Sequence, residues 1–135
     1  MRAIRIMALL VWLISSLLGI LIFSNLTSVQ WDFGEPRYGK KWVYQSVSVA
    51  YNGYMFDVSF ILNISLLDAS NNTLTSKTEH RILKPGSRVL LEFNFSVENI
   101  SDIKWVVTSI SLYQLIGNSR IIGISIISMR QQGGA

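Results

Sequence analysis

The chain has 135 residues and a formal net charge of +4, and charged residues make up only 15% of it. Arg2 and Arg5 precede an apolar segment, so the remainder balances ten of the twelve basic side chains against eight acidic ones, which excludes the clustered basic face typical of nucleic-acid-binding proteins. Cysteine is absent, which excludes disulfides and Cys-based metal sites and favours a prokaryotic or archaeal surface protein over a small secreted eukaryotic domain.

The first predicted element is a membrane helix. Residues 6–24 contain no charged side chain, and as a helix these 19 residues span about 28 Å, close to the hydrocarbon thickness of a bilayer. This predicts an N-terminal transmembrane anchor over residues 1–24. One alternative is a cleaved signal peptide, for which residues after Ser24 offer only a poor cleavage site. Another is a pilin-like leader cut near Arg2-Ala3, which would leave Arg5 inside the apolar helix.

The flanking charges and small residues of this helix predict its orientation and its packing. Arg2 and Arg5 lie on its short N-terminal side, so the positive-inside rule predicts a cytoplasmic N-terminus and an extracellular C-terminal domain. Ser15 and Gly19 are four residues apart on one face, a spacing that lets a second membrane helix approach closely. Alternatively, serine and glycine are simply tolerated there. We expect a single-pass protein of the cell membrane.

Residues 25–41 are predicted to form a juxtamembrane linker rich in aromatic and basic side chains. Aromatic rings with a polar edge prefer the bilayer interface, and cations there meet lipid head groups. The candidate membrane-interface residues are Trp31, Phe33, Tyr38, Lys40, Lys41 and Trp42. In the alternative interpretation, the aromatic residues are ordinary core residues at the entry to a strand.

Acceptor triplets for N-glycosylation, Asn-x-Ser/Thr, are unusually frequent after the apolar segment. Eight asparagines in a chain that is about 17% serine and threonine should give one or two triplets by chance. The candidate glycosylation sites are Asn25, Asn63, Asn71, Asn94 and Asn99. Because N-glycosylation occurs outside the cytoplasm, they agree with the orientation that the arginines predict. The alternative is a surface protein rich in asparagine and serine whose triplets stay unmodified.

Residues 42–130 alternate between apolar and polar side chains, which is typical of strands with one buried face. In residues 56–66 every second side chain is apolar, which leaves Asn63 on the polar face. Residues 89–97 repeat the pattern and leave Asn94 on the polar face. Turn residues divide the region into six predicted strands, at 42–50, 55–67, 73–83, 87–97, 103–115 and 119–130.

These strands predict an all-β extracytoplasmic domain over residues 42–130. Their short connections make neighbours antiparallel and leave no room for a crossover helix. We therefore expect an antiparallel Ig-like β-sandwich, or a small jelly roll, of six to seven strands. The segment RILKPGSRVLLEFNFSV, residues 81–97, resembles the x-Pro-Gly turn and following strand of Ig-like accessory domains in archaeal and bacterial surface proteins. Residues 131–135, QQGGA, are predicted to be a flexible tail.

The last predicted strand is apolar on both faces. One face carries Ile121, Ile127 and Met129, and the other carries Ile122, Ile124 and Ile126. A two-layer domain has a core on only one side of each sheet, so the second face needs a cover. Either another part of this chain covers it, or another chain does so by pairing with the strand. Ile122, Ile124 and Ile126 are the candidates for that intermolecular contact.

No motif predicts catalysis. His80 is the single histidine, and there is no nucleophile elbow, glycine-rich phosphate loop or calcium-loop spacing of acidic residues. We therefore expect neither an enzyme activity nor a cofactor, and no metal site.

The predicted function is that of a membrane-anchored, N-glycosylated structural or accessory subunit of a cell-surface or membrane complex. Its expected partners are the lipid bilayer, N-linked glycans and other membrane or surface-layer proteins, with self-assembly included and nucleic acid excluded. The architecture is similar to that of bitopic β-sandwich stator components of archaeal motility machinery and of single-helix accessory subunits of membrane enzymes. The alternative is a secreted filament subunit, of a pilus or thread, that polymerises by β-strand complementation after the signal is removed.

Overall fold

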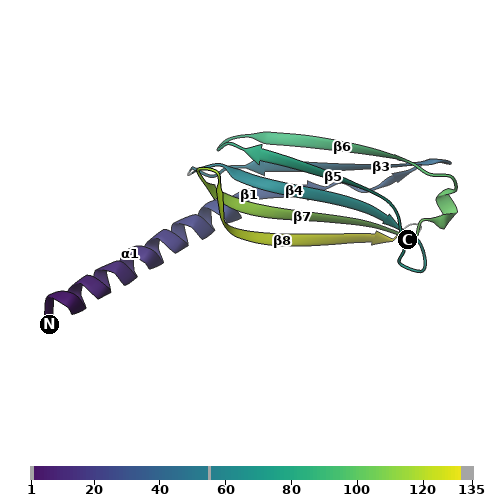
Figure 1. The fold of residues 1–135 in the computed structure, drawn as a ribbon. Helices are drawn as coiled ribbons and strands as arrows, with labels where there is room; N and C mark the ends of the chain where they lie inside the picture. Colours follow the sequence, from purple (N-terminus) through teal and green to yellow (C-terminus); the bar gives the residue numbers. More distant parts are fainter. Residues whose placement is uncertain (1, 55, 132–135) are drawn as a thin grey trace.

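The computed structural model describes residues 2–54 and 56–131. Over these residues, one long helix, α1 (Arg2–Thr27), leads into eight strands that form two antiparallel sheets of four strands each (Figure 1). The prediction of an N-terminal apolar helix followed by a β domain is therefore confirmed. Gln131 ends the last strand, and the rest of the predicted tail lies outside the described residues.

The first sheet is built around β3 (Trp42–Tyr51). β6 (Arg88–Ser96) pairs with β3 along nearly its whole length. Two shorter strands share the other edge: β1 (Val29–Phe33) pairs with the second half of β3, and β2 (Arg37–Tyr38) pairs near its start. All of these pairs are antiparallel, as the short connections predict.

The second sheet has the strand order β5-β4-β7-β8. β4 (Val58–Leu67) and β7 (Trp105–Ile116) occupy its centre, while β5 (Thr73–Leu83) and β8 (Ser119–Gln131) are its edges. A single 3-10 turn, η1 (Ile100–Asp102), lies between β6 and β7, with Asn99 as its N-cap. The six predicted strands correspond to β3 to β8, each within about three residues at either end.

The two sheets bury one apolar core in a sandwich-like arrangement. Val47 and Val49 of β3 and Phe95 of β6 share a buried cluster with Phe60 and Leu62 of β4. Alternation produces this core because successive side chains of a strand point to opposite faces. The predicted inward faces of β4 and β6 are therefore confirmed along the strands themselves.

Phe56 is the exception to the predicted inward face. β4 begins only at Val58, and Phe56 has a φ of 57° with 44% of its surface exposed. A positive φ removes the backbone from the extended conformation, so the alternation of β4 does not reach this residue. Phe56 lies instead on the surface, in the connection between β3 and β4.

The connections divide the β domain into two ends, which we name by their relation to α1. The helix-proximal end comprises the end of α1 and the connections 52–57, 84–87 and 117–118. Two backbone hydrogen bonds hold parts of this end together: Asn52 N donates to Ser28 O at 3.3 Å, and Gly86 N donates to Tyr51 O at 2.8 Å. The distal end comprises the connections 34–41, 68–72 and 97–104 and the end of β8 (Figure 1). A ten-residue strand separates the two ends by about 33 Å.

The segment predicted as a linker, residues 25–41, is largely part of the first sheet. It contains the last turn of α1 and both short strands, β1 and β2. The two strands have five and two residues and lie on either side of the turn residues Gly34 and Pro36, so each is too short for a period of two to be recognised. The anchor therefore continues directly into the domain without a flexible spacer.

Candidate functional site

α1 has the properties of a membrane-spanning helix. Its most apolar window has a mean hydropathy of 2.7, and none of that window is buried against the rest of the protein. Among the residues that the structure describes, it is the one helix whose length and composition suit a bilayer. A helix that is apolar all round needs an apolar surrounding, which this chain does not itself supply.

The C-terminal turn of α1 is built into the β domain. Leu26 is fully buried and belongs to the apolar core cluster. Asn25, beside it, is also fully buried, and its Nδ2 donates a hydrogen bond of 2.7 Å to Oε1 of Gln114 in β7. Oδ1 of Asn25 accepts a hydrogen bond of 3.2 Å from the backbone N–H of Tyr54. One helical turn thus contacts both the second sheet and the connection between β3 and β4.

Gln114 extends this contact into a buried polar network, which we call the junction network. Its Nε2 donates to the carbonyl oxygens of Asp57 and Leu115, at 3.2 and 3.1 Å. Tyr51 donates from its hydroxyl to the carbonyl oxygen of Phe56 at 2.9 Å, and burial raises the pKa of this phenol above its ordinary value. Buried polar groups that satisfy one another fix a single geometry, so α1 leaves the domain in a defined direction.

The predicted glycosylation sites differ strongly in their surroundings. Asn71, Asn94 and Asn99 are exposed, and all three lie towards the distal end. Asn63 is half-buried in the middle of β4, between Thr78 and Ser109, on the outer face of the second sheet. In the triplet of Asn99, the Oδ1 atom accepts a hydrogen bond of 2.9 Å from the hydroxyl of Ser101.

The candidate glycosylation site Asn25 is fully buried in the fold. The nitrogen that would carry the sugar donates to Gln114 inside the junction network, and the side chain has no exposed surface. A glycan there would have to displace the last turn of α1 from the core. Sequence could not reveal this, because the burial of Asn25 depends on Gln114 of β7, which lies 89 residues further along the chain.

We expect glycan occupancy to follow this exposure. In protein purified from its native membranes, peptide mapping by mass spectrometry should find glycans on Asn71, Asn94 and Asn99 and none on Asn25. Asn94→Gln should remove one glycan mass, whereas Asn118→Gln, a control at an exposed asparagine outside any triplet, should remove none. A glycopeptide that contains Asn25 would contradict the buried junction.

The predicted membrane-interface residues are not gathered beside α1. Tyr38, Lys40, Lys41 and Trp42 lie at the distal end, where the N–H of Val97 donates to the carbonyl oxygen of Lys41. Trp31 and Phe33 lie along β1, opposite Val49 and Val47. The proximity of this segment to α1 in sequence is misleading, because β1 runs away from the helix and carries the chain to the other end of the sheet.

β8 distributes its apolar residues differently from the prediction. Ile124 and Ile126 are half-buried and pack against the core, while Ile122 is 42% exposed. The opposite face is the exposed one: Ile127 and Met129 are 66% and 54% exposed. The core of this chain therefore covers much of the face that was proposed for intermolecular contact, and a partner at this edge would meet Ile127 and Met129 instead.

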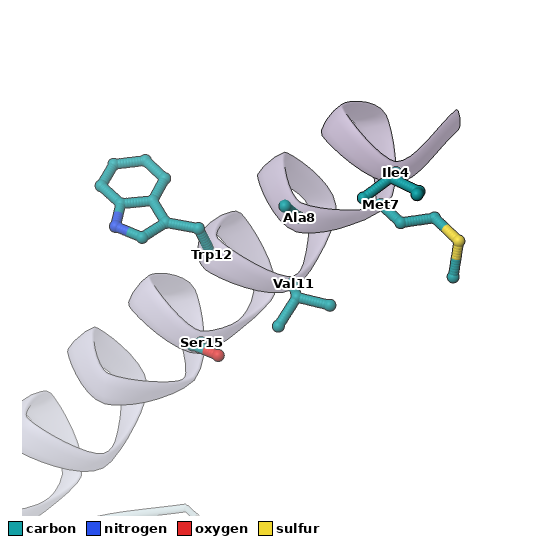
Figure 2. A pocket seen from close by; sticks show the side chains of 6 residues that line it. All are labelled: Ile4, Met7, Ala8, Val11, Trp12 and Ser15. Carbon is teal, nitrogen blue, oxygen red and sulfur yellow. The ribbon is translucent and has the colours of Figure 1, made fainter. Parts of the chain in front are cut away.

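The candidate helix-packing residues lie on the exposed surface of α1. Ser15 lines a shallow groove with Ala8, between Trp12 and the side that carries Met7 and Val11 (Figure 2). Nothing within 4 Å would touch a side chain built on Gly19. The groove is open to a second helix, but a small-residue stripe on a membrane helix is equally compatible with lipid, so helix packing stays a prediction.

Residues 2–54 and 56–131 contain no cluster of candidate metal-binding side chains. Within these ranges no three His, Asp or Glu side chains come close enough together to hold a metal ion. His80 is exposed on the edge strand β5, opposite Ile61. Cavities lined by several polar groups lie on the surface near Glu35, Glu98 and Asn94.

Sequence reasoning missed the junction network and the exposed apolar residues next to it. Gln114 did offer a signal, since it follows Ile110 and Leu112 at the same spacing on the inward face of β7. A polar side chain at an apolar position indicates a buried hydrogen bond. Tyr54 and Phe56 offered no such signal, because their exposure depends on where the connection between β3 and β4 lies relative to α1.

Comparison with known proteins indicates the fold only. No family model matches the sequence, and no curated protein matches it. Among solved structures, the ApaA protein from Bordetella pertussis is 9% identical, with a TM-score of 0.54 over 79% of this chain and 95% of that one. A late embryogenesis abundant protein studied in solution is 16% identical, with a TM-score of 0.50 over 94% of this chain and 86% of that one.

A third similarity is to a β-glucosidase from Kluyveromyces marxianus, at 11% identity and a TM-score of 0.39. This chain spans only 14% of that enzyme. A similarity with this TM-score carries no argument about catalysis, and the low identities of the first two structures indicate the fold alone.

Proposed function

We propose that this chain is a single-pass membrane protein whose β domain acts, outside the cell, as a non-catalytic structural or accessory subunit of a membrane or cell-surface complex. The observation that carries the proposal is the junction between α1 and the domain. An exposed apolar helix of membrane-spanning length enters a folded β domain through the buried residues Asn25 and Leu26. A helix that contributes residues to the core of the domain is expected to remain in the mature protein. A cleavable signal peptide has no need to pack against the domain.

The orientation is supported by two independent features. Arg2 and Arg5 precede the apolar segment, as in helices with a cytoplasmic N-terminus. Three exposed acceptor asparagines, Asn71, Asn94 and Asn99, lie towards the distal end of the domain, where a glycan would meet neither α1 nor a bilayer. The proposed molecule carries its sugars on the surface that points away from the membrane.

The strand order supports an Ig-like domain in preference to a jelly roll. One sheet contains β1, β3 and β6, and the other has the order β5-β4-β7-β8. Lettered in chain order as in immunoglobulin domains, these are strands A, B and E facing strands C′, C, F and G, with β2 as an addition beside strand B.

A role as a subunit is supported by surfaces that the chain leaves uncovered. β8 is an edge strand, and its outer face exposes Ile127 and Met129 beside Val107 of β7. An edge strand with apolar side chains pairs readily with another chain. On α1, the groove beside Ala8 and Ser15 offers a second contact within the membrane.

The alternative, a filament subunit that polymerises by strand complementation, is favoured by one observation. Removal of a signal near residues 25–30 would take Asn25 and Leu26 from the core and shorten or delete β1. The edge of β3 that β1 covers would then be open to a strand from a neighbouring subunit. N-terminal sequencing of the mature protein separates the two functions, since a start at Met1 or Arg2 supports the anchor.

Because the chain contains no cysteine, single cysteines give a direct test of topology. In intact cells, an impermeant maleimide should label Ser70→Cys in the distal connection and should leave Ala3→Cys unlabelled until the cells are lysed. Both variants should stay in the membrane fraction after carbonate washing, and extraction in mild detergent should recover each with partner proteins. Labelling of Ala3→Cys alone in intact cells would overturn the orientation, and recovery as a lone monomer would overturn the role as a subunit.

A further inference from the structure

The length of α1 brings the β domain into contact with the bilayer. Residues 6–24 span about 28 Å as a helix, which fills a hydrocarbon core of about 30 Å and leaves the head-group layer, about 5 to 8 Å on each side, beyond Ser24. The next two residues, Asn25 and Leu26, are already buried inside the domain. Within that head-group layer there is no spacer, so the helix-proximal end of the domain must occupy it.

The side chains at this end suit the membrane interface. Tyr54 and Phe56 are 64% and 44% exposed, and Ile116 at the end of β7 is 37% exposed. The backbone N–H of Tyr54 is held at 3.2 Å from Oδ1 of Asn25, so this connection lies directly beside the end of α1. Aromatic rings that combine an apolar body with a polar edge prefer the head-group level of a bilayer.

The charges at this end are mostly positive. Lys84, Arg88 and Arg120 are exposed there, and Asp57 is the only acidic residue of the connecting segments. The Arg120 guanidinium lies over the Tyr113 ring, 4.6 Å from its centroid, which holds this cation at the turn between β7 and β8. Each basic residue near an anionic membrane surface adds to its attraction.

We propose that the helix-proximal end is a built-in membrane-contact surface that rests in the head-group layer of an anionic bilayer. Tyr54, Phe56 and Ile116 enter the interface, and Lys84, Arg88 and Arg120 meet lipid phosphates. The inference rests on the proposed membrane anchoring by α1. The inference assigns the interfacial role that was predicted for residues 31–42 to a different part of the chain. Contact with the bilayer would then fix the orientation of the domain, in addition to the junction with α1.

Spin labels on single cysteines measure this directly in the full-length protein. Tyr54→Cys and Phe56→Cys report on the contact surface, Ser70→Cys on the distal end, and Leu17→Cys on the centre of α1. The protein is reconstituted in nanodiscs of phosphatidylcholine mixed with anionic phosphatidylglycerol. The collision rate of each label with a water-soluble nickel complex and with oxygen is then measured. We expect the labels at positions 54 and 56 to meet nickel several-fold less often than the label at position 70.

The outcomes separate this inference from the anchoring on which it rests. Nickel access at position 17 equal to that at position 70 would overturn the membrane anchor. In a second outcome, the label at position 17 meets oxygen but not nickel, while the labels at positions 54 and 56 meet nickel as often as the label at position 70. This outcome would overturn the contact surface and leave the membrane anchor intact.

A second variant tests the charges without touching the aromatic residues. Lys84→Glu combined with Arg120→Glu should raise nickel access at position 54 in anionic nanodiscs, while Lys40→Glu combined with Lys41→Glu at the distal end should leave it unchanged. If Lys84→Glu combined with Arg120→Glu leaves nickel access at position 54 unchanged, Lys84 and Arg120 do not bind lipid phosphates.

Discussion

Leu26→Ala should lower the free energy of unfolding of the β domain by about 2 to 5 kcal/mol. Leu26 belongs to α1 by secondary structure, but it is fully buried in the core that the two sheets share. Removing three carbon atoms there loses apolar burial and leaves a cavity, since the surrounding strands can close only partly around it. Denaturant unfolding in detergent micelles, followed by the fluorescence of the domain tryptophans, measures the change.

The matched control for this substitution is Leu21→Ala, five residues earlier on the same helix. Leu21 is 40% exposed and does not belong to the buried core cluster. It should change the unfolding midpoint of the domain little, because the loss concerns contact with detergent or lipid. Equal effects of the two substitutions would mean that the helix and the domain are separate units joined by a loose connection, which the buried junction contradicts.

Asn25→Ala and Gln114→Ala should each cost about 1 to 3 kcal/mol, and the double variant should cost clearly less than the sum. Each single substitution removes the buried hydrogen bond between Asn25 Nδ2 and Gln114 Oε1, which are 2.7 Å apart and out of contact with water. Once that bond is lost, replacing the second residue has no further bond between the two to remove. The same denaturant measurement on the four proteins of the cycle gives the coupling.

Asn94→Ala serves as the control in this cycle when the protein is made without glycosylation. Asn94 is exposed on β6, so its replacement should change stability little. It should also add independently to the effect of Gln114→Ala. If the changes in unfolding free energy for Asn25→Ala and Gln114→Ala add strictly in the double variant, the junction network does not couple the helix to the sheet. The hydrogen bond would then not explain a fixed direction of α1.

The two stability predictions also bear on the alternative function. A domain that begins after residue 27 lacks both Leu26 and Asn25. It therefore loses the apolar burial of Leu26 and the hydrogen bond between Asn25 and Gln114. Such a fragment should be stable only if another strand or helix replaces them. A filament subunit would obtain that replacement from its neighbour, whereas an anchored subunit keeps it in its own chain.

The sequence by itself determined those features that depend on neighbouring residues. The uncharged run of residues 6–24 predicts α1. The period of two in residues 56–66 and 89–97 predicts both strands and their buried faces, with Phe56 as the exception. Hydrophobic periodicity suffices here because a helix or a strand exposes its faces at fixed intervals, whatever it later packs against. The polar position of Gln114 within an apolar face was visible in the same way.

Only the tertiary structure decided what each residue meets. Asn25 became a buried hydrogen-bonding group because β7, far along the chain, brings Gln114 to it. Trp42 and Lys41, close to α1 in sequence, lie at the opposite end of the domain because β1 carries the chain away from the helix. Tyr54 and Phe56 lie beside the end of α1 because β3 brings the chain back to the helix-proximal end before the connection to β4. These positions follow from pairings between distant strands, and no local pattern of side chains records which strands will pair.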